Sequence, residues 1–366
     1  MTPRPVRISA VDLFCGVGGL SYGLQEAGIR VGAGVDLDDS CRYPYETNIG
    51  SKFHHLDVCD LQADDLTPLW TPGSARVLAG CAPCQPFSPH RRGADTSSET
   101  QWRLVEEMGR LVKGALPEIV TMENVPRIIS ARVFERFVAL LRSLGYHVAS
   151  RSCYCPTYGI PQHRRRLVLV ASLLGEIKVP DGTVASTDFV TVRQAIGDLP
   201  AIKHGHEDPK DRIHKSRTLS ATNLKRIKRA VPGGTWEQWP DDLKSPCHRR
   251  SSGATFRNVY ARMAWDEPSP TITTMAYNFG TGRFGHPEQD RPISLREAAI
   301  LQSFPHDYKL VAPEAPVQFL SLGRHIGNAV PPMLAEAVGT AIVDHVKSIK
   351  GSVRRYRRKI SAPVRA

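Results

Sequence analysis

The sequence reads Val77-Leu78-Ala79-Gly80-Cys81-Ala82-Pro83-Cys84-Gln85-Pro86-Phe87-Ser88 where a short apolar run meets a cysteine that follows a proline. The apolar residues predict a buried parallel strand that ends at Gly80. In open α/β sheets, ligands and reacting groups lie just beyond the carboxyl ends of the strands. Residues 88–98 are polar, with small side chains and arginines, as is typical of a loop that closes over a site. We therefore interpret Cys84 as a reactive thiol at the edge of such a sheet.

Other interpretations of Cys84 are open from this segment alone. A single cysteine is more often a small buried apolar residue than a nucleophile. The spacing of Cys81 and Cys84 also fits a redox pair or half of a zinc site. A zinc site would need a second pair at ligand spacing, and Cys153 and Cys155 are too close to supply it. A redox pair is expected where a helix begins, whereas a predicted loop follows Cys84. Because the second cysteine pair that zinc requires is missing from the sequence, we expect no metal.

The composition indicates a large protein with a polyanionic partner. The chain has 366 residues, which is long for a single hydrophobic core, so two lobes are expected. The formal net charge of +12 and the sequence pI of about 9.4 favour a nucleic acid as the partner. No apolar run approaches the ~20 residues of a membrane-spanning helix, and we expect no cleavable signal before the first strand. The eight cysteines are expected to be reduced thiols, which indicates a cytoplasmic protein.

A second segment, Asp12-Leu13-Phe14-Cys15-Gly16-Val17-Gly18-Gly19, ends the first predicted strand at residues 6–14. Apolar residues at helical spacing follow and stop at Gly28. A strand, a glycine turn and a helix in this order allow the backbone to approach a cofactor closely. The dinucleotide fingerprint would need another glycine where Ser21 stands, which weakens a nicotinamide interpretation. A tight turn without a ligand is the alternative at this point.

Two carboxylates follow the next predicted strands. Asp36 ends the strand at residues 31–35, about 20 residues beyond the glycines, where an acid can accept hydrogen bonds from ribose hydroxyls. Asp57 ends the third unit and is suited to an exocyclic adenine amine. Either acid alone is more often a solvated residue at a strand end. Together with the glycine turn, they indicate a cofactor that carries a nucleoside but no pyrophosphate.

The apolar patterns that follow predict the remaining helices and strands of the first lobe, and the composition of the chain changes from residue 179. Apolar spacing predicts helices and strands at residues 102–116, 119–122 and 134–144, and a hairpin-like pair at 146–150 and 166–171. From residue 179 to 292, prolines, glycines, histidines and basic residues dominate, which favours a second, smaller lobe of irregular β structure whose loops meet a partner. Aromatic residues in this stretch argue against a disordered linker.

Regular structure is predicted to return near the end of the chain. Ser294 is a helix cap that can form a capping box with Glu297, and Pro305 ends that helix. A last helix is predicted at residues 333–346. Residues 351–366 form a basic tail that we expect to be disordered and weakly attracted to phosphates.

Six segments stand in one order along the chain: residues 12–19, residues 83–88, Glu123-Asn124-Val125, Gln162-x-Arg164-x-Arg166, Arg296-Glu297-x-Ala299 and Gly327-Asn328-Ala329-Val330-Pro331. With this set, the sequence resembles the bacterial-type DNA (cytosine-5) methyltransferases, which use S-adenosylmethionine. The resemblance covers most of the chain outside the second lobe. Many relatives have arginine where Ile300 stands, so a local salt bridge is expected to be missing here.

The resemblance implies an α/β fold. The expected architecture is a doubly wound, mainly parallel sheet of the Rossmann-like S-adenosylmethionine-dependent methyltransferase type, with a second, smaller, irregular target-recognition domain. The catalytic S-adenosylmethionine-binding domain is expected at residues 1–178 and 322–350, the target-recognition domain at 179–321, and the tail at 351–366. The final helix would pack back beside the first strand.

The resemblance also implies roles for individual residues. Cys84 would add to carbon 6 of a flipped-out cytosine, and Glu123 would bind the exocyclic amine and ring nitrogen 3. Arg164 and Arg166 would orient the base, the lid and nearby phosphates. The expected contacts to S-adenosylmethionine are Phe14, Gly16, Gly18, Asp36, Leu37, Asp57, Val58, Pro83, Leu104 and Asn328. The expected contacts to DNA are Gln85, Ser88, Arg91, Arg92, Thr271 and Thr273.

The implied reaction converts cytosine in a specific duplex sequence to 5-methylcytosine, as the modification step of a restriction–modification system. The protein is expected to act as a monomer on double-stranded DNA, without a metal and without a membrane. A cognate restriction endonuclease is expected to act separately. Two alternatives stay open: methylation of cytosine in transfer RNA, and DNA binding by a catalytically silent relative.

Overall fold

The computed structural model describes residues 7–83, 103–250 and 256–349. The chain divides into two compact units. The first unit comprises Met1–Tyr154, Arg165–Gly182 and Val330–Ala366, and the second comprises Cys155–Arg164 and Thr183–Ala329. This division differs from the expected one chiefly at residues 155–164 and 322–329, which belong to the second unit. The expected tail at residues 351–366 lies outside the described residues.

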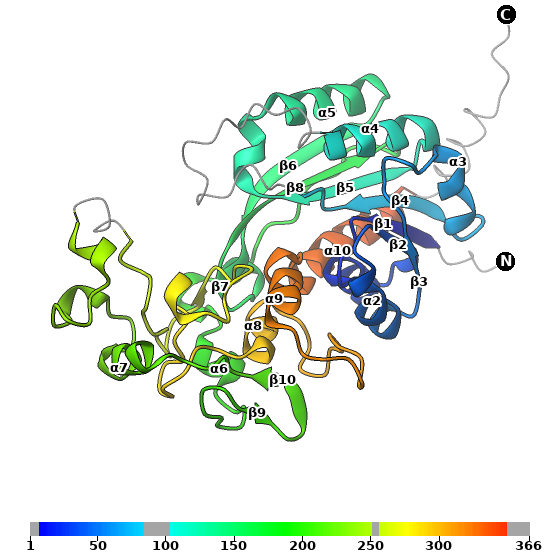
Figure 1. The fold of residues 1–366 in the computed structure, drawn as a ribbon. Coiled ribbons are helices and arrows are strands. Elements are labelled where there is room, and N and C mark those ends of the chain that lie inside the picture. Colours follow the sequence, from blue (N-terminus) through cyan, green and yellow to red (C-terminus); the bar gives the residue numbers. More distant parts are fainter. Residues whose placement is uncertain (1–6, 84–102, 251–255, 350–366) are drawn as a thin grey trace, which may run out of the picture. The chain divides into compact units, whose positions relative to one another are not determined.

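A seven-stranded sheet forms the centre of the first unit (Figure 1). Its order is β3 (Lys52–His55), β2 (Arg30–Asp36), β1 (Ile8–Leu13), β4 (Ala75–Gly80), β5 (Ile119–Asn124), β8 (Arg165–Ser172) and β6 (His147–Tyr154). Neighbours from β3 to β5 run parallel, and β8 is antiparallel to both β5 and β6. The strand order reverses between β1 and β4, so their carboxyl ends form the switch point of the sheet. The expected doubly wound, mainly parallel sheet is confirmed.

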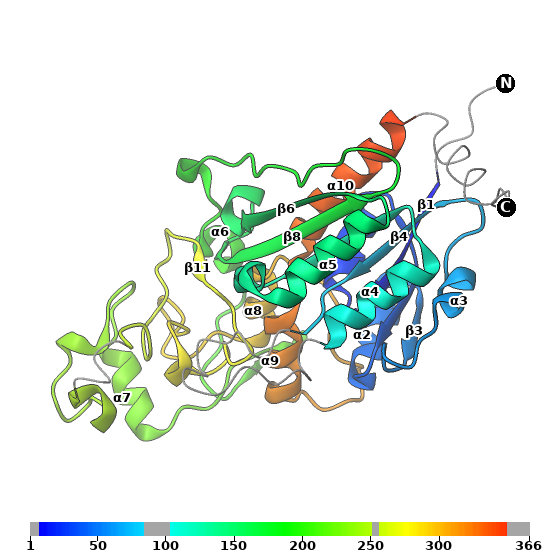
Figure 2. The same ribbon diagram turned by 90° about the horizontal axis from the view of Figure 1, so that it is seen from above.

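Helices cover both faces of this sheet, and its central strands are therefore buried. Every residue of β1 and of β5 is buried. On one face lie α4 (Arg103–Ala115) and α5 (Arg132–Ser143), and on the other lie α1 (Gly19–Glu26), α2 (Arg42–Ile49) and α10 (Pro332–Ser348) (Figure 1, Figure 2). The apolar faces of α4 and α5, together with α3 (Ala63–Leu66), join the strands in one core. The predicted antiparallel pairing of β6 and β8 is also present.

The last helix, α10, belongs to the core of the first unit. Within the described residues, Phe319–Ser348 is long and apolar enough to cross a membrane by length and composition alone. Residues 329–331 divide this stretch into α9 (Phe319–Asn328) and α10. α10 packs against α1 so closely that a Cβ on Gly339 would lie 2.7 Å from the Cβ of Ala27. This burial accounts for the apolar composition of α10.

The second unit is irregular, as predicted. Where the structure describes this unit, its strands form two short pairs, β7 (Gln162–His163) with β11 (Ser269–Pro270) and β9 (Glu207–Asp208) with β10 (Asp211–Lys215). Its helices in the described residues are α6 (Val192–Ile196), α7 (Ala221–Arg229), α8 (Leu295–Leu301) and α9. A small apolar cluster that includes Ile227 of α7 and two tryptophans gives this unit a core of its own. α9 was not predicted, since the sequence analysis placed only the last helix, at residues 333–346, in this part of the chain.

A buried ion pair fixes α8 in the second unit. The predicted capping box is confirmed, since Ser294 and Glu297 each accept from the other's backbone N–H. Glu297 also binds both terminal nitrogens of Arg291, at 2.6 and 2.7 Å, and both side chains are 1% exposed. Arg291 lies in the loop before the helix, so this ion pair is a different one from the salt bridge that an arginine at the position of Ile300 would form.

We expect Glu297→Gln to destabilise the protein by about 3 kcal/mol or more, because the buried charge of Arg291 would lose its partner. Burial alone would raise the pKa of Glu297, but the charge and hydrogen bonds of Arg291 outweigh it and lower that pKa to about 2. The stabilisation is therefore complete above the ordinary pKa of 4.5 and is lost as the pH falls toward 2. Urea unfolding at pH 7 and at pH 3 measures both effects.

The exposed pair of Arg193 and Asp266 is the control for this prediction. Asp266→Asn should leave the urea midpoint unchanged, because solvent screens exposed ion pairs. A Glu297→Gln midpoint equal to that of the wild type at pH 7 would contradict the structural importance of the buried pair.

Candidate active site

β1 leads into a tight turn at the switch point of the sheet. After Leu13 the chain turns through Phe14, Gly16 and Gly18, whose φ angles are +58°, +51° and +92°. Positive φ angles are uncommon for a residue other than glycine, so the backbone of Phe14 is strained. Strained residues of this kind cluster at ligand sites. No atom of the described residues lies within 4 Å of the position that a Cβ on Gly16 would take, so among these residues the backbone there is open to a ligand. Phe14 is half-buried and packs against the core of the sheet.

A buried acid lies beneath this turn. Asp12 is fully buried, and its Oδ2 accepts the hydroxyl of Ser21 at 2.7 Å. The hydroxyl of Ser21 is in turn 3.0 Å from that of Tyr45. Burial raises the pKa of Asp12 to about 7. Ser21, which stands where the dinucleotide fingerprint would have a glycine, therefore holds the base of the turn through its side chain.

Asp36 ties the turn to β2. Its Oδ2 accepts the backbone N–H of Gly16 at 2.8 Å, and its Oδ1 accepts the N–H of Asp38 at 2.9 Å. Each carboxylate oxygen has a further lone pair, so Asp36 can also accept hydrogen bonds from ligand hydroxyls. The sequence indicated only the ligand contact. The second task of Asp36, which is to hold the glycine turn in place, appears only in the structure.

Apolar and acidic side chains line the ends of β2 and β3. Leu37 is 64% exposed and Leu56 is 44% exposed, which is unusual for large apolar residues and offers a surface to a planar base. Asp57 accepts the backbone N–H of Cys59 at 2.9 Å, and this hydrogen bond lowers the pKa of Asp57. An ionised carboxylate here can accept from an amine. Leu56 was not predicted, because exposure is not visible in the sequence.

The other expected cofactor residues differ in their surroundings. Val58 is buried in the core, Leu104 is half-buried against it, and Pro83 is exposed after β4. Asn328 is exposed at the end of α9 and belongs to the second unit, so its contact with a cofactor stays a prediction.

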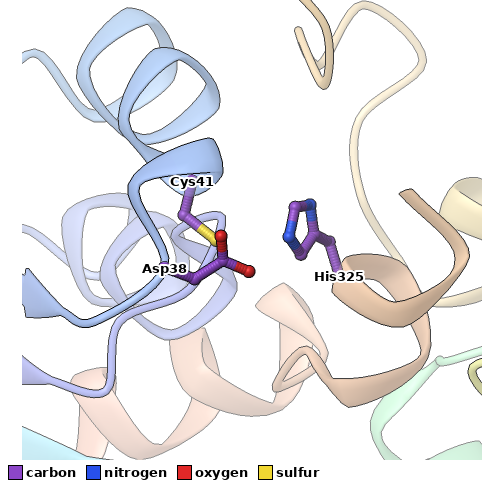
Figure 3. Close-up of side chains that lie close together, drawn as sticks. All are labelled: Asp38, Cys41 and His325. Carbon is purple, nitrogen blue, oxygen red and sulfur yellow. The ribbon is translucent and has the colours of Figure 1, made fainter. Parts of the chain in front are cut away.

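Figure 3 shows three side chains of a type that can bind metals: Asp38, Cys41 and His325. Asp38 and Cys41 follow β2 in the first unit, where Asp38 caps a short turn by accepting the N–H of Ser40 at 3.2 Å. His325 lies on α9 of the second unit. Because the three side chains belong to different units, they define no metal site in either one.

The carboxylate of Glu123 is held from two sides. Glu123 lies near the end of β5 and is 5% exposed. Arg166 of β8 places its Nε 3.0 Å from Oε1, and the thiol of Cys81 donates to Oε2 at 3.1 Å. The strand order explains this meeting, because β4 and β8 are the two neighbours of β5. Glu123 and Arg166 were predicted as site residues, whereas the contact with Cys81 was not.

The segment that leads to Cys84 is anchored to both neighbouring strands. The N–H of Cys81 donates to the carbonyl of Leu13 at 3.3 Å. Asn124 donates to the carbonyl of Ala82 at 3.1 Å and so joins the ends of β4 and β5. This role of Asn124 was missed by the sequence analysis. Residues 84–102, which include Cys84, Gln85, Ser88, Arg91, Arg92 and the expected lid, lie outside the described residues.

Arg164 lies inside the second unit. It is 1% exposed and donates to the backbone carbonyls of Ile272 at 3.0 Å, Gly327 at 3.1 Å and Ala329 at 3.4 Å. Gln162 accepts the N–H of Ile272 at 2.8 Å. This placement does not fit the expectation that Arg164 orients the base or a phosphate, since its guanidinium braces loops instead. Alternate residues of one short motif therefore serve different units, and Arg166 is the one beside Glu123.

The two expected DNA contacts in the second unit lie close to this brace. Thr271 donates its hydroxyl to the carbonyl of His163 at 2.6 Å. Thr273 is exposed, and its hydroxyl accepts the N–H of Met275. A Cβ on Gly327 would lie 2.3 Å from the backbone nitrogen of Thr274, so only glycine allows α9 to approach this loop so closely. The DNA contacts of both threonines stay predictions.

Comparisons with known proteins give matches both in sequence and in fold. The model of the family described as C-5 cytosine-specific DNA methylase matches residues 8–344. The Type II methylase M.HgiDII of Herpetosiphon aurantiacus is 44% identical over 337 residues, which cover 91% of this chain and 94% of that protein. The Type II methyltransferase M1.HphI of Haemophilus parahaemolyticus is 30% identical over 346 residues, with coverage of 92% and 87%. The S. pombe Dnmt2 methyltransferase has a similar fold, with a TM-score of 0.64 at 18% identity, over 94% of this chain and 99% of that one.

Proposed function

This chain belongs to the C-5 cytosine-specific DNA methylase family, and on that basis we propose how its residues transfer a methyl group to carbon 5 of cytosine. The protein is a DNA (cytosine-5-)-methyltransferase with Type II modification enzymes among its relatives. The observation that carries the proposed mechanism is the carboxylate of Glu123, clamped by Arg166 and Cys81 just beyond the strand that leads to Cys84.

The methyl donor is S-adenosylmethionine, and several described residues suit it. The open backbone at Gly16 admits a ligand, Asp36 can accept from ribose hydroxyls, and Asp57 can accept from an adenine amine. The exposed side chain of Leu37 offers an apolar surface to the adenine ring. Phe14 provides an aromatic face that attracts a cation. When bound, the donor supplies a methyl group on a positively charged sulfur.

Carbon 5 of cytosine is too weak a nucleophile to accept that methyl group directly. We assign to Cys84 the addition of a thiolate to carbon 6, which breaks the ring double bond and leaves carbon 5 rich in electrons. After carbon 5 has gained the methyl group, a base removes its proton, the double bond forms again and the thiolate leaves. A free thiol with a pKa near 8.5 is only a few per cent ionised at neutral pH, so the site must favour the thiolate.

Glu123 keeps charge from building up on the ring. Its carboxyl group binds the exocyclic amine and gives a hydrogen bond or a proton to ring nitrogen 3 as the thiolate adds. Arg166 holds this carboxylate through the ion pair. Arg164 acts as a positioning residue that braces the loops of the second unit.

The target base must leave the duplex, because its reacting carbons cannot be reached inside the stack. Gln85, Ser88, Arg91, Arg92, Thr271 and Thr273 are our proposed DNA contacts. The net charge of +12 supports binding to the phosphate backbone. We further propose a cytoplasmic monomer that modifies a specific duplex sequence, with a cognate endonuclease acting separately.

Transfer of tritiated methyl groups tests the substrate class. We expect incorporation into duplex DNA and none above background into transfer RNA, because two Type II enzymes are 44% and 30% identical to this chain over most of its length. Bisulfite sequencing of the product should place 5-methylcytosine in one sequence context. Incorporation into transfer RNA that equals or exceeds that into DNA would contradict the assignment.

A further inference from the structure

Cys81 contacts the carboxylate of Glu123, but the mechanism above gives it no role of its own. It is the first residue after β4, and its backbone N–H is bound to the carbonyl of Leu13 at the end of β1. This anchor sets where its side chain begins. The Sγ atom lies 3.1 Å from Oε2 of Glu123, at an oxygen different from the one that faces Arg166. Each oxygen of the carboxylate therefore has its own partner, and the two partners come from different strands.

A single partner would leave the plane of this carboxylate poorly defined. The terminal torsion of a glutamate side chain is broad, so an ion pair at one oxygen allows the other oxygen to swing. Glu123 is 5% exposed, which leaves little room for water to restrain it. The thiol of Cys81 supplies the second restraint from the side opposite β8.

A thiol is suited to a contact with Glu123 that has to break when the base binds. A neutral S–H group is a weak donor, so a stronger donor such as the exocyclic amine of cytosine, or ring nitrogen 3 once it is protonated, can displace it at little cost. A charged donor at the same oxygen would compete with the base. Sulfur can also accept weakly when the carboxyl group carries a proton, so the contact tolerates both protonation states of Glu123.

We propose that Cys81 is a positioning residue that holds Oε2 of Glu123 ready for the cytosine and yields to it when the base arrives. This inference rests on the proposed role of Glu123. It gives a task to a cysteine whose spacing from Cys84 also fitted a redox or zinc pair.

Cys81→Ala should slow single-turnover methyl transfer about three- to tenfold, the scale of one weak hydrogen bond, with no change in DNA affinity. Cys81→Ser, which keeps a donor, should recover at least half of the wild-type rate. The decisive measurement is a double-mutant cycle with Glu123→Gln. In the Glu123→Gln background, Cys81→Ala should change the rate by less than twofold, because the carboxylate on which it acts is already lost.

Cys153→Ala is the matched control, since the thiol of Cys153 lies in the same unit and points to the carbonyl of Arg151 instead of to Glu123. It should change the rate by less than twofold. Equal slowing by Cys81→Ala in both backgrounds would overturn the inference, as would a wild-type rate in Cys81→Ala. A wild-type rate in Glu123→Gln alone would instead overturn the proposed function of Glu123, and the inference with it.

Discussion

Cys84→Ser should abolish methyl transfer while the variant still binds duplex DNA. A serine hydroxyl is almost never ionised at neutral pH and cannot replace a thiolate as the group that adds to carbon 6. Tritiated methyl incorporation should fall to background, and a gel-shift titration should give an affinity close to that of the wild type. Oligonucleotides with 5-fluorocytosine at the target should trap the wild-type enzyme as a covalent adduct through residue 84 and should not trap the variant.

The exposed Cys247 in the second unit provides the control for this substitution. Cys247→Ser should retain wild-type turnover and should still form the trapped adduct. Full activity in Cys84→Ser, or a wild-type adduct that maps to another residue, would remove Cys84 from the mechanism.

Glu123→Gln should slow methyl transfer by about 10²-fold or more, which is the scale of a well-placed acid or base. Glutamine has nearly the same size but cannot exchange a proton with ring nitrogen 3, and it cannot pair with the charge of Arg166. Single-turnover rates with saturating DNA and methyl donor measure the effect on chemistry. DNA affinity should change much less than the rate.

Glu118→Gln separates the loss of a buried ion pair from the loss of chemistry. Glu118 is fully buried in the same unit and pairs with Arg76 at 3.1 Å, but it lies just before β5, at the opposite end of that strand from Glu123. Its substitution should lower the thermal midpoint and leave the rate per folded molecule within threefold of the wild type. A loss below threefold in Glu123→Gln would exclude the role assigned to that residue.

Local patterns in the sequence predicted much of the fold. The apolar runs before Phe14, Asp36 and Gly80 are strands in the structure, and the helices at α4 and α5 follow the predicted apolar spacing. The capping box at Ser294 is also present. Each of these features depends on residues close together in the chain, which is why periodicity and capping chemistry reveal them.

Contacts between residues that are far apart in the sequence were harder to predict. The sequence did not reveal the buried ion pair of Glu297, because its partner, Arg291, lies in a loop before the helix, where no helical spacing points to it. Arg164 and Arg166 were given one role, yet the boundary between the two units falls directly after Arg164. Nothing in the spacing of the motif distinguishes a brace from an ion pair at the site.

The sequence by itself determined the family and the parallel sheet and predicted the reacting groups, because these follow from motif chemistry and from short-range periodicity. Only the tertiary structure decided how those groups are held. Cys81 and Glu123 are 42 positions apart and meet because β4 and β5 are neighbours in the sheet. Strand order arises from the packing of the whole unit, so no local pattern could have indicated that a thiol and an arginine share one carboxylate.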